Sequence, residues 1–297
     1  MTVLEHRPTP TRPLLGRRLH RTLNRPLLAL AALMAVTAMA TAVLAVVDPV
    51  QITGHNGWVK PVKFSLSFGI YALTLAWLID RLPERRQRAG RLGAWVLVVA
   101  ALIEMAVIVG AVAAGTTSHF NVSSPLATGL WATMGTAVVV LWLVNLVLAA
   151  LLWRAPDADA AVRLAIRAGL VIGLAGLAVA FFMTSPTAEQ LDSFSGVAGA
   201  HAVGVADDGP GLPFFGWSTT GGDLRVPHFV GMHALQALPL LALGLEVLAR
   251  RVPALRDPGT RFRVVSVASA GYAVLLVLLT LQALAGIPVT QPLGFLG

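Results

Sequence analysis

Long apolar stretches alternate with short polar links along almost the whole chain. Seven of these stretches are long enough to cross the roughly 30 Å hydrocarbon core of a bilayer as helices. They cover residues 27–47, 62–79, 92–114, 126–153, 164–183, 226–248 and 264–285. The pattern predicts an all-α, multi-pass membrane protein with seven transmembrane helices.

The composition agrees with this pattern. Of the 297 residues, 56% are hydrophobic and 12% are charged, and the mean hydropathy is +0.76. Most of such a chain cannot form a water-exposed surface. We expect a basic N-terminal segment, 1–25, followed by a seven-helix membrane domain, 26–297, which includes one long loop, 185–225.

Positive charge is concentrated on one side of the predicted membrane. The N-terminal segment and the second, fourth and sixth links hold 19 of the 22 Lys and Arg residues. Links rich in these residues stay in the cytoplasm, so we predict a cytoplasmic N-terminus and a periplasmic C-terminus in a bacterial inner membrane. The net charge of +8 is then explained by topology and by the lipid bilayer as a partner, and indicates no nucleic-acid binding.

The chain has no cysteine, which excludes disulfides, iron–sulfur clusters and covalently attached haem. Any metal ion must be held by His, carboxylate, Met or backbone oxygen. No phosphate-binding loop, nucleophile elbow or dinucleotide fingerprint is present. Internal repeats, which would favour a two-repeat transporter, are also absent from the sequence.

Five of the seven histidines fall on the predicted periplasmic side. They are His55, His119, His201, His228 and His233. Imidazoles that converge from separate helices hold metal ions or b-type haem, so we expect ligands among the last four, with His119 and His233 as the axial pair.

Spacing limits how two of these histidines act. His228 and His233 differ by five positions, about 140° around a helix, and so cannot both bind one ion from a regular helix. Gln236, Leu240 and Gly244 follow His233 on one helical stripe, which we interpret as the wall of a pocket.

Three cations oppose the charge bias: Lys60, Lys63 and Arg225. Their predicted periplasmic position favours an anionic partner, such as haem propionates, a carboxylate or phosphate substrate, or lipid headgroups. The alternative is that the two lysines only lengthen a short membrane helix.

Glu104 lies near the middle of the third predicted helix. An ionisable group at that depth is costly, so it is either a proton relay toward the outer site or a protonated carboxyl bonded to a neighbouring helix. Asn145 is a candidate polar partner.

Two groups of small residues predict close helix packing. One comprises Gly169, Gly173 and Gly176 in the fifth helix, and the other is the run 110–115. The 185–225 loop is long and aromatic, which favours an ordered lid in the headgroup zone over a solvated tether, with a purely interfacial belt as the alternative.

Three polar segments carry a resemblance to known proteins. They are 58–64 (WVKPVKF), 116–121 (TTSHFN) and 216–236 (GWSTTGGDLRVPHFVGMHALQ). With them the chain resembles uncharacterised bacterial multi-pass inner-membrane proteins. The resemblance implies a membrane location and supplies no activity.

The leading hypothesis is a redox or haem-binding membrane protein that holds haem b or a His-bound iron, copper or zinc, with a quinone or electron-transfer partner. In it Gln236 supports the ligands, Lys60, Lys63 and Arg225 bind anions, and Glu104 relays protons. One alternative is a membrane hydrolase with zinc on three of His119, His201, His228 and His233. The other is a metal-free transporter or sensor of a small anionic ligand. The sequence does not decide whether the protein is an enzyme.

Overall fold

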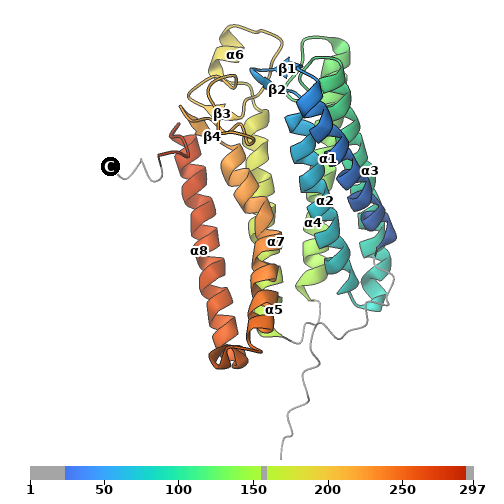
Figure 1. Ribbon diagram of the computed structural model, residues 1–297, viewed down its shortest axis with the longest axis vertical. Coiled ribbons are helices and arrows are strands. Elements are labelled where there is room, and N and C mark those ends of the chain that lie inside the picture. Colours follow the sequence, from blue (N-terminus) through green and yellow to red (C-terminus); the bar gives the residue numbers. More distant parts are fainter. Residues whose placement is uncertain (1–23, 155–158, 292–297) are drawn as a thin grey trace, which may run out of the picture.

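The computed structural model describes residues 24–154 and 159–291, and within them it contains seven helices long and apolar enough to cross a membrane (Figure 1). These are α1 (Arg25–Val47), α2 (Val59–Asp80), α3 (Glu84–Ala113), α4 (Pro125–Trp153), α5 (Ala160–Val179), α7 (Arg225–Leu248) and α8 (Pro258–Leu284). The predicted all-α, seven-span membrane fold is confirmed. Most of the predicted basic segment lies outside the described residues.

Helix ends follow local capping chemistry. Ser124, Asp159 and Asp257 each accept backbone N–H groups from the first turn of the helix that follows. Proline occupies the first position of α4 and of α8, where its missing N–H costs nothing. At its C-terminal end α5 continues as a 3₁₀ turn, η2 (Ala180–Thr184). With this turn the fifth span reaches the end of the predicted apolar stretch, 164–183.

The helices form two packed groups. In the first, α1 lies along α2 and α3 lies along α4, and in the second, α5 packs against both α7 and α8 (Figure 1). The groups meet mainly through α4 and α5, while α2 and α7 touch only sparingly. A seam between α2 and α7 therefore separates the two groups.

Glycines set the close approach of α5 and α7. A Cβ atom added to Gly176 would lie 2.4 Å from the Cα of Gly231, and one added to Gly169 would lie 2.9 Å from the carbonyl oxygen of Ala234. The predicted seam on α5 is confirmed. The prediction for the run 110–115 is wrong for its glycines: a Cβ added to Gly110 would meet no atom of another helix within 4 Å, and Gly115 instead ends α3 with a positive φ of 68°.

The long loop is an ordered cap on one end of the bundle. It contains the short helix α6 (Ala188–Asp192) and the strands β3 (Ala202–Val203) and β4 (Gly222–Asp223), which pair antiparallel. A small hairpin of β1 (Gln51–Ile52) and β2 (His55–Asn56) lies at the same end (Figure 1). Because a Cβ at Gly222 would lie 1.9 Å from the carbonyl oxygen of Ala283, the cap is seated tightly on α8.

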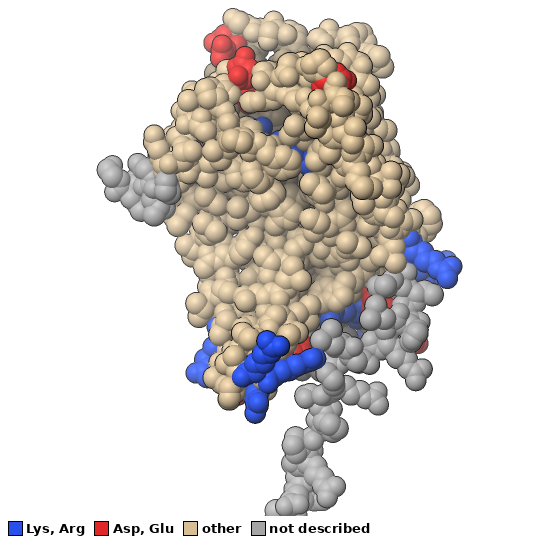
Figure 2. All heavy atoms as spheres, viewed as in Figure 1, with Lys and Arg blue, Asp and Glu red and all other residues tan. Residues whose placement is uncertain are grey.

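The two ends of the bundle differ in charge. We call the end that carries residues 185–224 the long-loop end, and the opposite end, reached by Arg81 and Arg250, the arginine end. Figure 2 shows most visible Lys and Arg side chains at the arginine end. The few basic atoms visible near the other end lie within a hollow beneath the cap.

Candidate functional site

Two lysines lie one turn apart at the start of α2. Lys60 Nζ lies 3.1 Å from His119 Nδ1, and Lys63 Nζ donates to the carbonyl oxygen of Phe215 at 2.9 Å. Among the described residues neither ammonium has a carboxylate within ion-pair distance. Within the described ranges, two adjacent basic groups therefore lack an ion-pair partner, which is costly away from bulk water.

Arg225 is bound differently from the lysines. Its guanidinium holds the buried Asp223 carboxylate with two bonds, Nε to Oδ1 at 2.9 Å and NH2 to Oδ2 at 2.6 Å. NH2 also donates to the Gly216 carbonyl oxygen at 2.6 Å. This charge is compensated within the protein, and Arg225 anchors the cap as well as adding to the positive field.

His119 lies in the link between α3 and α4, surrounded by aromatic rings. The ring centroids of Phe64 and Trp131 are 5.7 and 5.5 Å from its own. When Lys60 carries its full positive charge it can only donate, and the His119 Nδ1 beside it then accepts while Nε2 carries the hydrogen. Burial, with the positive charge of Lys60 and the nearby His201, holds the pKa of His119 well below its usual value.

His201, from the cap, forms a pair with Asp207. Its Nδ1 lies 2.8 Å from Asp207 Oδ2, and the backbone N–H groups of His201 and Ala202 also donate to that carboxylate. Burial lowers the pKa of His201 and outweighs the opposing effect of Asp207. Burial would raise the pKa of Asp207, but these hydrogen bonds prevail and lower it to about 2.

Phe120 separates His119 from His201. Its ring centroid is 4.8 Å from that of His201 and 6.1 Å from that of His119. It adopts a φ of 63°, a left-handed backbone conformation that is rare for an aromatic residue. Strain of this kind is held in place only by well-packed surroundings, and it is found preferentially at functional sites.

His228 faces α5 from the first turns of α7. Its Nδ1 lies 2.9 Å from the Gly176 carbonyl oxygen, and because a carbonyl only accepts, Nδ1 carries the hydrogen. His201 and His233 lie within electrostatic range of it. His201 and His228 thus each have an engaged Nδ1, an orientation that is typical of imidazoles whose Nε2 binds a ligand.

His233 lies on the outward stripe of α7. Leu240, further along this stripe, is 65% exposed, and Gly244 has no neighbour within 4 Å. The interpretation of the stripe as a pocket wall is therefore wrong for Leu240 and Gly244, whereas His233 and Gln236 are half-buried beside α2, where Gln236 bonds to Thr74. Among the described residues no contact links His233 with His119. His55 is exposed on β2.

No set of three metal ligands forms in the described part of the chain, since no three His, Asp or Glu side chains there come close enough to hold one ion. The zinc hydrolase alternative gains no support from this arrangement. Haem ligation by two imidazoles needs only a pair, and it stays a prediction.

Glu104 is buried in the middle of α3, with 1% of its surface exposed. Its Oε1 has no hydrogen-bond partner, and its carboxyl group lies within electrostatic range of Lys60. The expected pairing with Asn145 is wrong, because Asn145 bonds to Tyr71 and to the carbonyl oxygen of Leu141. Glu104 is therefore a buried carboxyl group within electrostatic range of Lys60.

We call the space among Lys60, His119, His201 and His228, beneath the cap, the recess, because these four side chains lie near one another. Lys60, His119, His201 and His228 are surrounded by protein, yet each keeps part of its surface accessible. Figure 2 shows the hollow at this end with basic atoms inside it. The recess lies at the long-loop end of the seam between the two helix groups, with Lys60 at the start of α2 on one side and His228 at the start of α7 on the other.

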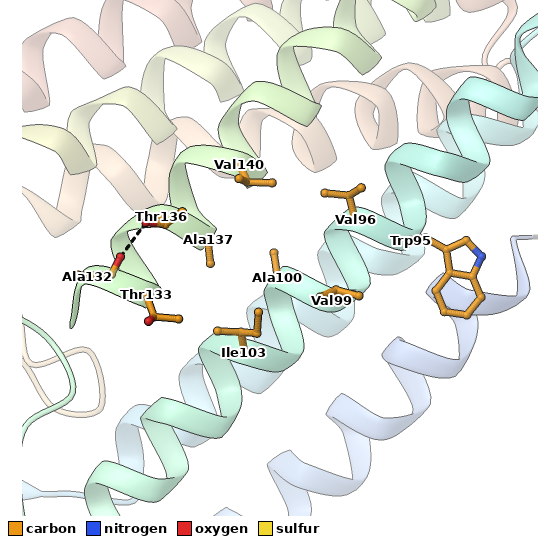
Figure 3. Close-up of a pocket in the computed structure, with 10 residues that line it drawn as sticks. All are labelled: Trp95, Val96, Val99, Ala100, Ile103, Ala132, Thr133, Thr136, Ala137 and Val140. Atoms are coloured by element: carbon orange, nitrogen blue, oxygen red, sulfur yellow. Dashed lines mark hydrogen bonds between the residues drawn. The ribbon is translucent and has the colours of Figure 1, made fainter. Parts of the chain in front are cut away.

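A second hollow is apolar and carries no chemistry. It is a groove of about 600 Å³ between α3 and α4, lined by Ala100, Ile103, Ala137 and neighbouring residues (Figure 3). The hydroxyl groups of Thr133 and Thr136 bond to carbonyl groups of their own helix, which leaves methyl groups facing the groove. Such a surface suits acyl chains of the bilayer.

Several residues of the recess were missed from the sequence. Asp207 looks like part of a turn, Asp223 stands two residues before Arg225, and Phe120 and Trp131 look like ordinary interfacial aromatics. The spacing of Asp223 and Arg225 was a usable signal, because neighbouring opposite charges at a helix start often pair.

No family model, curated protein or solved structure matches the chain.

Acid should weaken the cap in two separate ranges of pH. The pKa values of His119 and His201 are lower in the folded protein than their usual value of 6.5, so the unfolded chain binds protons more readily. Their contribution to stability is complete above pH 6.5 and is lost as the pH falls below it. Asp207, with its pKa lowered from 3.8 to about 2, contributes roughly 2 kcal/mol that is lost only between about pH 4 and pH 2.

The measurement is the melting temperature of detergent-solubilised protein as a function of pH. His119→Gln and His201→Gln should flatten the fall below pH 6.5, and Asp207→Asn should remove the lower step. His55→Gln, at an exposed position, is the control and should keep the native profile. Identical profiles for all four variants would contradict the assignment.

Proposed function

We propose that this multi-pass membrane protein binds a small oxyanion, a phosphate or a carboxylate, in the recess and transports or senses it. The protein then lies in the bacterial inner membrane with the long-loop end toward the periplasm. One observation carries the proposal: Lys60 and Lys63 have no carboxylate partner among the described residues, although both lie in a confined space.

The surrounding groups suit an oxyanion. The two ammonium groups and the Nε2–H of His119 are donors, and Arg225 adds positive charge nearby. His201 and His228 remain neutral acceptors through Nε2, which matches an anion that still carries a proton, such as hydrogen phosphate. In this proposal the buried Glu104 carboxyl group, within electrostatic range of Lys60, exchanges a proton with the site.

Replacing either lysine should weaken binding with little loss of fold. Lys60→Met and Lys63→Met each remove a charge-assisted bond of about 1.5–3 kcal/mol, so each should weaken binding by roughly tenfold to a hundredfold. The probes are inorganic phosphate and succinate, with chloride as the reference, measured by calorimetry on the full chain in lipid nanodiscs. Arg251→Met removes one exposed charge at the arginine end and is the matched control.

Uptake of labelled phosphate or succinate into proteoliposomes then separates a transporter from a sensor. Unchanged affinities in Lys60→Met and Lys63→Met would contradict the proposal. If binding weakened equally in Arg251→Met, the effect of the lysines would be an effect of the protein's overall charge and not of a specific site.

Haem binding is the second candidate. It is favoured by the engaged Nδ1 atoms of His201 and His228, which leave Nε2 for an axial bond, while Lys60, Lys63 and Arg225 suit propionate groups. A Soret band in gently purified protein, lost in His201→Ala and His228→Ala, would move the assignment from a free oxyanion to haem. The same spectrum tests His119 and His233, the pair of axial ligands predicted from the sequence.

A further inference from the structure

A polar cluster lies at bilayer depth in the seam between α2 and α7. It comprises His233 and Gln236 on α7 and Thr74 on α2. His233 follows the start of α7 by eight residues, about 12 Å along the helix, so the cluster lies below the recess and within the hydrocarbon region. The proposed oxyanion site does not use it.

The cluster opens toward lipid. His233 and Gln236 are half-buried on the outward stripe of α7, between Phe229, which is 39% exposed, and Leu240, which is 65% exposed. On α2 the neighbouring Ile70 and Leu73 are 48% and 53% exposed. Polar groups at this position face the hydrocarbon of the bilayer, where water supplies no partner.

The hydrogen bonds fix the direction of every donor. The single hydroxyl hydrogen of Thr74 goes to the carbonyl oxygen of Ile70 at 2.8 Å, so Thr74 Oγ1 accepts from Gln236 Nε2 at 3.2 Å. Gln236 Oε1 then faces His233 Nδ1 at 3.3 Å and must accept from it. His233 Nε2 is left as a bare acceptor without a partner among the described residues, and Gln236 keeps one N–H to donate.

An aromatic wall, formed by Phe215, Trp217 and Phe229, lies beside His233. The ring of Phe229 contacts His233 edge to face, with centroids 4.4 Å apart. Phe215 and Trp217 stack on each other at 4.5 Å and both contact Phe229. A ligand that enters from the bilayer therefore meets a flat apolar surface next to one hydrogen-bond acceptor and one donor.

We infer that the α2–α7 seam binds the head of a membrane-dissolved hydroquinone. A phenolic hydroxyl donates to His233 Nε2, an oxygen of the same head accepts the free N–H of Gln236, and the ring packs against Phe229. A quinone or an ether lacks the hydroxyl hydrogen that His233 Nε2 needs, so the site prefers the reduced head. The groups that bind the hydroquinone head, His233 and Gln236, are not those that bind the oxyanion, although Lys63 of the recess bonds to Phe215 of the aromatic wall.

The test compares decylhydroquinone with its dimethyl ether under anaerobic conditions, using the full chain in lipid nanodiscs and equilibrium binding. The hydroquinone should bind about tenfold more tightly than the ether, the effect of one satisfied hydrogen bond in a dry site. His233→Phe and Gln236→Leu should each weaken hydroquinone binding by about the same factor. His233→Gln restores an acceptor and should recover most of the affinity.

Two controls separate this site from lipid partitioning and from the recess. Leu240→Ala, on the same stripe, and Lys60→Met, in the recess, should leave hydroquinone binding unchanged. Equal binding of hydroquinone and ether, or native affinity in His233→Phe with an unaltered melting temperature, would overturn the inference. Equally tight binding of decyl alcohol would overturn the assignment of an aromatic head.

Discussion

Gly176→Ala should destabilise the protein by about 3 kcal/mol, at the upper end of the cost of overpacking, and lower its melting temperature by roughly 6 to 12 °C. The new Cβ atom would lie 2.4 Å from the Cα of Gly231 and 2.6 Å from the backbone N of Met232. These are backbone atoms, so no side-chain rotation relieves the clash. The helices α5 and α7 must separate, which also weakens the bond from His228 to the Gly176 carbonyl oxygen.

Gly129→Ala is the matched control, because this glycine lies on the exposed surface of α4 with nothing within 4 Å of an added Cβ. There the substitution removes only the flexibility of glycine in a helix, which is worth about 0.5–1 kcal/mol in favour of alanine. The two variants should therefore shift the melting temperature in opposite directions. A fall of equal size in both would show that the α5–α7 contact is not the cause.

The seven helices could be predicted because their signal is local. Each apolar stretch must satisfy its own backbone in lipid, and a helix is the solution available to a single segment. The helix N-cap residues Ser124, Asp159 and Asp257 explain where α4, α5 and α8 begin, which hydropathy alone leaves uncertain. The α5 glycines also predicted a close contact, although their partner on α7 was not identified.

The site was harder to predict because its contacts join distant parts of the chain. Lys60 meets His119 across 59 positions, and Lys63 meets Phe215 across 152. The orientation of His233 was open to inference: Gly231 faces α5, and two positions along a helix turn the side chain by about 200°. That step places His233 on the outer face, away from His119, and it depends on knowing which face of α7 packs.

Asp223→Asn should destabilise the protein by about 3 kcal/mol while strengthening oxyanion binding. The carboxylate is buried at 2% exposure, and it holds both Arg225 and the backbone N–H of Ser218. Removing one member of a buried ion pair leaves the other charge without compensation. The side chain of Arg225, one quarter exposed, then adds its full positive charge to the field around Lys63. A bound oxyanion supplies part of the negative charge that the substitution removes.

The two effects have opposite signs, which distinguishes a charge effect from simple damage to the cap. Melting temperatures of Asp223→Asn and of the native protein should differ most without ligand and converge as inorganic phosphate is added, because a ligand stabilises the folded state in proportion to its occupancy. Asp257→Asn is the control: its ion pair with Arg263 is exposed at 3.8 Å, and asparagine still caps α8, so stability and phosphate affinity should hardly change. A destabilised Asp223→Asn that gains nothing from phosphate would mean that Arg225 serves the cap alone and that the lysines act without it.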